Sequence, residues 1–140
     1  MNAYAPIVLF VYNRPEHTLR TVTSLLKNPE AARSDLFVFS DAAKDKSAEE
    51  AVKQVREYIR QISGFKAVTV NERESNWGLA NSVIDGVTRI CNEFGKVVVL
   101  EDDLHVSPHF LAYMNAGLER YVHDEQVMQI SGYMFPVEIQ

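Results

Sequence analysis

The chain has little cysteine, no run of basic residues and no long apolar segment, and each absence narrows what it can be. Cys91 is the only cysteine in 140 residues, which excludes a disulfide framework and a thiolate metal cluster and predicts a buried free thiol. A net charge of −5 without a basic run argues against nucleic acid as a partner. With no secretory signal and no membrane-length segment, we expect a cytoplasmic protein, at most peripheral to the inner face of the membrane.

Two common phosphate-binding motifs are also absent. No G-x-G-x-x-G follows the first expected strand and no P-loop pattern occurs, which argues against dinucleotide dehydrogenases and P-loop enzymes. A phosphoacceptor receiver domain is excluded as well, because its paired acids would follow the first strand and here they follow the fourth. Any phosphate must therefore be bound in another way.

Apolar runs and helical periodicities alternate along the chain. Strands are expected at residues 7–12, 36–40, 68–70 and 97–100, and helices from 15, over 47–62, over 79–94 and after 108. Leu19, Val22 and Leu26 should form the buried face of the first helix, and residues 127–133 should form a last strand. Strands separated by such helices predict one α/β domain, a three-layer, Rossmann-like architecture with a mainly parallel sheet.

Three carboxylates, Glu101, Asp102 and Asp103, directly follow the fourth strand. The β-branched run before them predicts a strand covered on both faces, and ligands of open α/β sheets gather at such strand ends. Adjacent acids repel phosphate, so a nucleotide diphosphate would need a divalent cation between them, and oxygen ligands suit Mg²⁺ or Mn²⁺. The alternative is a solvated acidic turn.

The residues around these acids resemble a known family. Residues 7–14, 37–41 and above all 97–113 (VVVLEDDLHVSPHFLAY) are similar to the nucleotide-binding half of the glycosyltransferase A fold. The resemblance is to N-acetylglucosaminyltransferase I and to bacterial family 2-type glycosyltransferases. It implies that Asp103 is the metal ligand, for Mn²⁺ or Mg²⁺, and that Glu101 and Asp102 position the sugar and ribose of the donor.

Single residues elsewhere in the chain also resemble the donor site of this family. The resemblance places Arg14 and Asp41 at the nucleotide base, and a carboxylate can accept the imide N–H of uracil, so a UDP-sugar is the implied donor. Val11 and Asn13, at the end of the first strand, belong to the same expected site. Asp41 can instead be a turn-capping acid, and Arg14 a solvated surface charge.

The segment before the third long helix carries weaker matches. Asn76, Gly78 and Asn81 resemble a pattern that borders the donor in bacterial family 2 transferases, although Asn76 can also be a helix N-cap and Gly78 a turn residue. We interpret Trp77 as a packing anchor, a residue that packs within the fold, rather than as one that stacks on a sugar or a base. His105 and His109 follow the acids closely, and we interpret both as structural rather than as extra metal ligands.

The resemblance implies the donor-binding portion of an inverting glycosyltransferase that transfers sugar from a UDP-sugar to a glycan or lipid-linked acceptor. Domains of that family continue past the metal motif, so the catalytic base is expected beyond Gln140. The 1–140 chain is then expected to be truncated, inactive alone and prone to self-association through an exposed sheet edge. Two alternatives stay open: a sugar nucleotidyltransferase, although its glycine-rich signature after the first strand is missing, and a non-catalytic nucleotide-sugar-binding or interaction module.

Overall fold

A computed structural model describes residues 4–133 of the chain and confirms the predicted alternation of strands and helices. The long elements are β1 (Ile7–Val11), α1 (Pro15–Leu25), β2 (Asp35–Ser40), α2 (Glu49–Ile59), β3 (Ala67–Glu72), α3 (Leu79–Phe94), β4 (Val98–Glu101) and α4 (Phe110–Arg120). Two short 3₁₀ helices, η1 (Pro29–Arg33) and η2 (Lys46–Ala48), precede β2 and α2. The third strand is longer than its apolar run indicated, because polar residues continue the ladder with β2.

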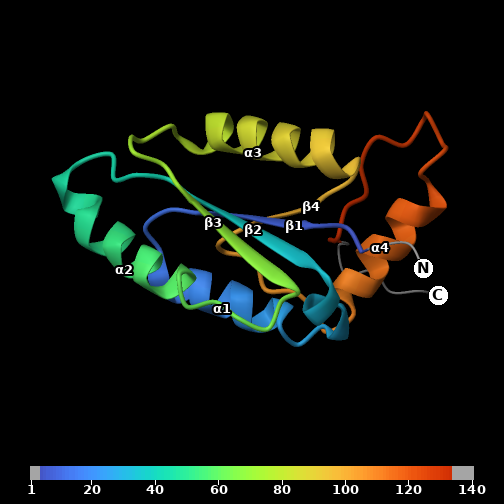
Figure 1. The fold of residues 1–140 in the computed structure, drawn as a ribbon, viewed down its shortest axis with the longest axis horizontal. Coiled ribbons are helices and arrows are strands. Elements are labelled where there is room, and N and C mark those ends of the chain that lie inside the picture. The colour runs from blue at the N-terminus through green and yellow to red at the C-terminus, as the bar shows by residue number, and fades with distance from the viewer. Residues whose placement is uncertain (1–3, 134–140) are drawn as a thin grey trace, which may run out of the picture.

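The four strands form one parallel sheet in the order β3-β2-β1-β4. Phe10 of β1 is in register with Phe39 of β2 and with Glu101 of β4, so these three side chains point to the same face of the sheet. Since all strands run the same way, their carboxyl ends meet at one edge (Figure 1). The residues that follow β1, β2 and β4 are thereby brought together from distant parts of the sequence.

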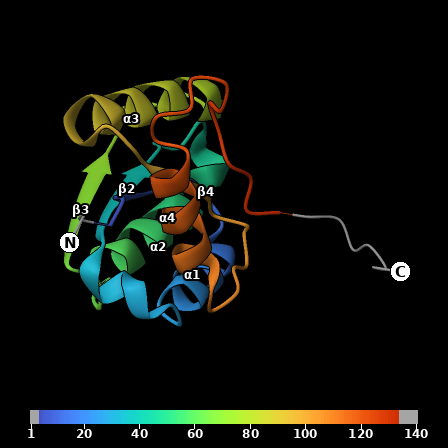
Figure 2. The same ribbon diagram turned by 90° about the vertical axis from the view of Figure 1, so that its right-hand side faces the viewer.

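Helices cover both faces of the sheet, which confirms the three-layer architecture. α3 lies on one face and α1 and α2 on the other (Figure 1), and α4 lies across one end of the second face (Figure 2). The core of the α1 and α2 side includes Val22, Leu25, Val55, Ile59, Leu111 and Met114. The core of the α3 side is smaller and is built on Val8, Phe10, Phe39 and Ile90.

The predicted inner face of α1 is partly wrong. Val22 is buried, but Leu19 and Leu26 are 47% and 41% exposed. The helix instead buries Thr21 and Ser24, whose hydroxyl groups bond to the segment that follows β4. A polar contact surface therefore replaces the leucine stripe that helical periodicity favoured.

Two expectations about strands are also corrected. Val99 is 39% exposed, because β4 is an edge strand of the described sheet and α3 lies mainly over Phe10 and Phe39. The stretch from 127 to 133 contains no strand. It runs back over α4 instead, where Ile130 packs so closely on Gly117 that a Cβ there would lie 2.7 Å from the isoleucine Cδ1.

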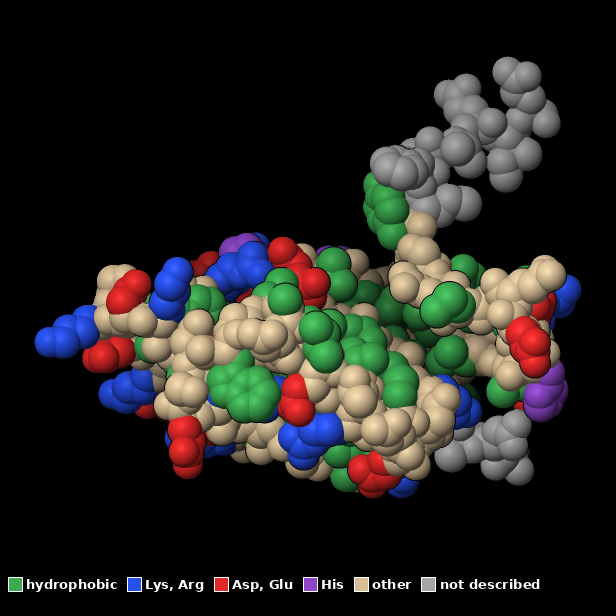
Figure 3. Space-filling view, turned by 90° about the horizontal axis from the view of Figure 1, so that it is seen from above, with side chains coloured by type: hydrophobic (Ala, Val, Ile, Leu, Met, Phe, Trp, Pro, Cys, Tyr) green, Lys and Arg blue, Asp and Glu red, His purple; other side chains and the backbone are tan. Residues whose placement is uncertain are grey.

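The outer surface on the α3 side is mixed in character. Hydrophobic side chains gather along the middle of this face between charged ones (Figure 3), and Trp77, Leu79 and Ile84 are exposed in α3 and the loop before it. Cys91 is only partly buried, which corrects the prediction of a buried thiol. Within residues 4–133 no helix is both long and apolar enough to cross a membrane.

Candidate functional site

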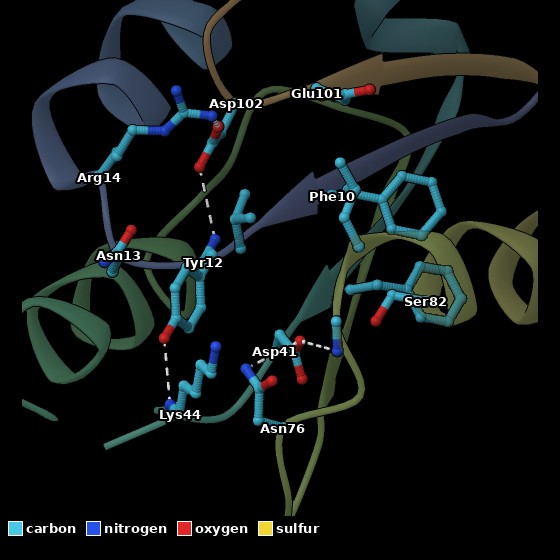
Figure 4. A pocket seen from close by; sticks show the side chains of 14 residues that line it. Phe10, Tyr12, Asn13, Arg14, Asp41, Lys44, Asn76, Ser82, Glu101 and Asp102 are labelled. Carbon is cyan, nitrogen blue, oxygen red and sulfur yellow. Dashed lines mark hydrogen bonds and ion pairs between the residues drawn. The ribbon is translucent and has the colours of Figure 1, made fainter. Parts of the chain in front are cut away.

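A cavity of about 570 Å³ opens at the carboxyl ends of the strands, a size typical of small-molecule sites. It brings together residues from the ends of β1, β2 and β4 and from the start of α3 (Figure 4). Eight residues that the sequence predicted for the donor site line it: Val11, Asn13, Arg14, Asp41, Asn76, Gly78, Glu101 and Asp102. Two predicted site residues, Asn81 and Asp103, do not line it.

One end of the pocket is an ion cluster. The guanidinium of Arg14 bonds to Asp102 through Nη2 and to Asp103 through Nη1, the latter at 3.2 Å. The side chain of Asp102 is 4% exposed and also accepts a bond from the backbone N–H of Tyr12 at 3.4 Å, whereas the side chain of Asp103 is 44% exposed. Asp102 is thus a buried, paired carboxylate and not part of a solvated acidic turn.

Arg14 therefore lies at the acids in this structure. Burial lowers the pKa of its guanidinium, but the charges and hydrogen bonds of Asp102 and Asp103 outweigh that effect, so the pKa is raised. Arg14 and Asp41 lie at opposite ends of the pocket in Figure 4. The prediction that Arg14 meets the nucleotide base stays a prediction, and neutralising the acids is the role that its contacts support.

The other end of the pocket is organised by Asp41, which is 7% exposed. Its Oδ1 accepts bonds from the backbone N–H groups of Ala42 (2.9 Å) and Trp77 (2.8 Å). Its Oδ2 accepts from the N–H of Gly78 (2.8 Å) and from Nδ2 of Asn76 (3.2 Å). A carboxylate offers about four acceptor positions, so these donors fill them. The capping interpretation of Asp41 is confirmed, and a contact of its carboxylate with uracil stays a prediction.

Two arginines hold the same end of the pocket in place. Arg56 of α2 donates to the backbone carbonyls of Asp41 (3.3 Å) and Arg73 (2.8 Å). Arg73 pairs with Asp85 of α3 at 2.7 Å, and its guanidinium lies 3.7 Å from the centroid of the Trp77 ring. The Trp77 ring packs on Arg73 and does not line the pocket, although the residue is 42% exposed. The loop from β3 to α3 is thus fixed to both helical layers.

The segment that carries the acids is fastened to α1 and to the residues after it. Thr21 Oγ1 donates to the carbonyl of Asp102 at 3.0 Å, and Ser24 Oγ accepts from the N–H of Val106 at 3.1 Å. Asn28 Oδ1 accepts from Leu111 N–H at 3.0 Å. These residues were missed, although Thr18, Thr21, Ser24 and Asn28 recur every three or four positions, which is the spacing of one helix face.

Several further pocket residues were also missed. Phe10, Phe39 and Leu79 form an apolar wall, and Tyr12, Lys44 and Ser82 add polar groups. The Tyr12 hydroxyl accepts a bond from the N–H of Lys44 at 3.0 Å, which ties the ends of β1 and β2 together. Ser82 is 4% exposed, and its Oγ has no hydrogen-bond partner among the described residues. The sequence signal that could have identified Tyr12 as a pocket residue was its position directly after a buried strand.

The remaining predicted residues lie outside the pocket. Asn81 Nδ2 donates to the carbonyl of Trp77 at 2.9 Å and so supports the first turn of α3. His105 and His109 are exposed, and within residues 4–133 no three His, Cys, Asp or Glu side chains form a metal-binding group. Asp103 alone still fits Mg²⁺ or Mn²⁺, because such ions are commonly held by one or two carboxylates together with substrate phosphates.

Comparisons with known proteins identify the family and the fold of this chain. The chain is 22% identical to alpha-1,3-mannosyl-glycoprotein 2-beta-N-acetylglucosaminyltransferase of Arabidopsis thaliana over 92% of its own length and 31% of that protein. Its fold is similar to that of S. aureus TarS, with a TM-score of 0.59 and 16% identity over 85% of this chain and 20% of TarS. A structure of TarS residues 1–349 gives a TM-score of 0.57 at 15% identity, over 85% of this chain and 33% of that one.

The chain thus spans about a third of the length of its curated relative. The sequence model of the GNT-I family matches residues 1–134, which is nearly the whole chain. The resemblance read from the acids after β4 is confirmed at the level of family and fold. The chain belongs to the GNT-I family of glycosyltransferases.

Proposed function

We propose that this chain is the donor-binding part of a glycosyltransferase that uses a UDP-sugar together with Mn²⁺ or Mg²⁺. The observation that carries the proposal is the pocket itself. It joins the acids after β4 to the ends of β1 and β2, and eight of the residues expected at the donor line it. Its apolar wall suits a planar nucleotide base, and its ion cluster suits a diphosphate.

The charges of the pocket indicate how a diphosphate would be accepted. Glu101, Asp102 and Asp103 repel phosphate, and Arg14 neutralises only part of that charge. A divalent cation on the exposed carboxylate of Asp103 would supply the missing positive charge and stabilise the diphosphate as it leaves the sugar. Asp102, buried against Arg14 and Tyr12, is placed to keep the end of β4 rigid beneath the donor.

The remaining parts of the function are also proposals. Inversion at the sugar and transfer to a glycan or lipid-linked acceptor rest on the family, and the expected catalytic base beyond Gln140 lies outside the described residues. The cytoplasmic location and self-association also stay predictions. A sugar nucleotidyltransferase and a non-catalytic module remain alternatives that no contact in the pocket favours.

A nucleotide panel tests the proposal. Calorimetry of the chain with Mn²⁺ and UDP, CDP, GDP or ADP should give the tightest binding for UDP. Glu101→Gln should weaken the binding of UDP-N-acetylglucosamine more than that of UDP, because the family resemblance puts Glu101 at the sugar. Glu93→Gln, an exposed substitution on α3, is the control and should change neither affinity. Equal affinities for all four nucleotides would exclude a uridine site.

A further inference from the structure

Arg14 bonds to two carboxylates that differ sharply in burial. Nη2 contacts Asp102, whose side chain is 4% exposed, and Nη1 contacts Asp103, whose side chain is 44% exposed, at 3.2 Å. One guanidinium therefore bridges a fixed acid and a solvent-exposed acid. The exposed acid is the one that fits a divalent cation.

The two halves of this bridge differ in strength. Removing the partner of a buried carboxylate is costly, and Asp102 is held further by the N–H of Tyr12. An ion pair on a half-exposed carboxylate contributes little and is screened by salt. A competing cation therefore displaces Arg14 from Asp103 far more readily than from Asp102.

We propose that Arg14 occupies Asp103 until a divalent cation replaces it, and that the released Nη1 then binds the diphosphate. This inference rests on the proposed function, because it uses a cation at Asp103 and a nucleotide in the pocket that Arg14 lines. Nη2 of Arg14 keeps its bond to Asp102 throughout, so only Nη1 changes partner. Cation and diphosphate then favour each other's binding, and this coupling is reciprocal.

The first test measures Mn²⁺ binding without nucleotide, from the loss of the electron paramagnetic resonance signal of free Mn²⁺. Arg14→Met should bind Mn²⁺ about tenfold more tightly than the natural chain, because a competing charge near the cation is removed. The control removes the same charge outside the pocket: Arg20→Met on the exposed side of α1 should change the affinity by less than about twofold.

The second test adds UDP. UDP should increase the affinity for Mn²⁺ strongly in the natural chain. The increase should be smaller in Arg14→Met, which has no guanidinium group to bind the diphosphate. Arg14→Lys is the second variant in case Asp102 without a partner impairs folding. Its single ammonium group keeps the charge but cannot bridge both acids in the same way, so its Mn²⁺ affinity without nucleotide should lie between those of the natural chain and Arg14→Met.

The outcomes separate this inference from the proposed function. Unchanged or weaker Mn²⁺ binding in Arg14→Met, or in Arg14→Lys if the first variant does not fold, overturns competition at Asp103. Equal UDP effects in the natural chain and the variant overturn the coupling. If UDP has no effect on any chain while Arg14→Met still binds Mn²⁺ more tightly, the competition stands and the proposed nucleotide site fails.

Discussion

At the scale of single residues, Asp41 supports the pocket through the four hydrogen bonds that its carboxylate accepts. Two of the donors are the N–H groups of Trp77 and Gly78, 36 and 37 residues further along the chain. Gly78 has a φ of 74°, a backbone conformation that glycine adopts without strain. The sharp turn into α3 therefore depends on a glycine at its centre and on one buried acid beneath it.

Replacing Asp41 by asparagine should destabilise the fold. An amide offers one acceptor oxygen, and its NH₂ group would face N–H donors, so charged hydrogen bonds are lost. We expect a loss of about 2 to 3 kcal/mol in the free energy of unfolding, measured by urea denaturation. Asp45→Asn, in the same loop but exposed, should lower the free energy of unfolding much less than Asp41→Asn does. Equal losses in the two variants would contradict the buried capping role.

The same variant separates two roles of Asp41 in nucleotide binding. If its carboxylate only holds the loop, Asp41→Asn should weaken UDP and CDP binding by the same factor. Competition calorimetry with the two nucleotides measures this ratio. A selective loss of UDP affinity would instead show that the carboxylate reads the uracil imide.

The sequence predicted the identity of most pocket residues but not their partners. Asp102 follows a β-branched run, and that position alone indicates a strand end. Its bond to Arg14 joins residues 88 apart, and no local pattern indicates which side of the pocket a flexible arginine will reach. Contacts of this kind depend on the packing of β1 beside β4, which is determined only once the sheet forms.

At the scale of elements, α3 approaches the sheet closely at Gly86. A Cβ there would lie 2.9 Å from ring atoms of Phe10 and 3.1 Å from the ring of Phe39. The two rings are buried and stacked, with centroids 5.5 Å apart, so neither has free space to move into. Because Phe10 also lines the pocket, this close approach shapes the apolar wall of the site.

Gly86→Ala should therefore destabilise the fold although alanine favours helices. A gain of about 1 kcal/mol in helix propensity is outweighed by a packing cost of about 1 to 3 kcal/mol, and we expect a small net loss. Thermal and urea unfolding measure it. Asn92→Ala on the exposed side of α3 is the control and should leave stability unchanged or slightly raised. A more stable Gly86→Ala chain would contradict the tight contact.

The pairing of α2 with β3 should make stability depend on pH. Hydrogen bonds from Arg60, both at 2.7 Å, lower the pKa of Glu72 below its ordinary value of 4.5. A carboxylate with a lowered pKa stabilises the fold above its unfolded pKa, and this contribution is lost as the pH falls through the folded pKa.

Urea denaturation at several pH values tests this link. From about pH 5 to about pH 3 the natural chain should lose stability more steeply than Glu72→Gln, since the variant has no carboxylate to protonate. Glu49→Gln, whose side chain is exposed, should keep the steep dependence. Parallel pH profiles for the natural chain and Glu72→Gln would show that the ion pair contributes nothing.

Hydrophobic pattern predicted the elements well wherever burial decides the structure. It failed for Leu19 and Leu26 because α1 packs against the segment after β4 through hydroxyl and amide groups. Such a polar contact produces no periodic pattern of apolar residues in the sequence. It failed for residues 127–133 because Ile130 packs on α4 without a strand neighbour, while Met128 and Tyr133 are exposed. Apolar residues in a short segment indicate burial, and only the three-dimensional neighbours decide between a ladder and a packed loop.

At the scale of the whole molecule, the parallel sheet determines where the site lies. Strand order β3-β2-β1-β4 places β1 between β2 and β4, so the residues after these three strands converge at one edge. The two sides of the pocket are then fixed separately. Arg14 and α1 hold the acids, and Asp41 and Arg56 hold the loop that leads to α3. This layout follows from alternating strands and helices, which explains why the fold and the general position of the pocket could be predicted from the sequence.

The central claim is that this pocket binds a uridine diphosphate group through a divalent cation on Asp103. The most direct test is calorimetry of UDP binding with Mn²⁺ present and with Mn²⁺ removed by a chelator, for the natural chain and for Asp103→Asn. The claim predicts clear binding only with Mn²⁺, and loss of that metal-dependent part in Asp103→Asn with unchanged circular dichroism, since Asp103 lies outside the core. Equal UDP affinity with and without the metal, or an Asp103→Asn chain that keeps full metal-dependent binding, would contradict it.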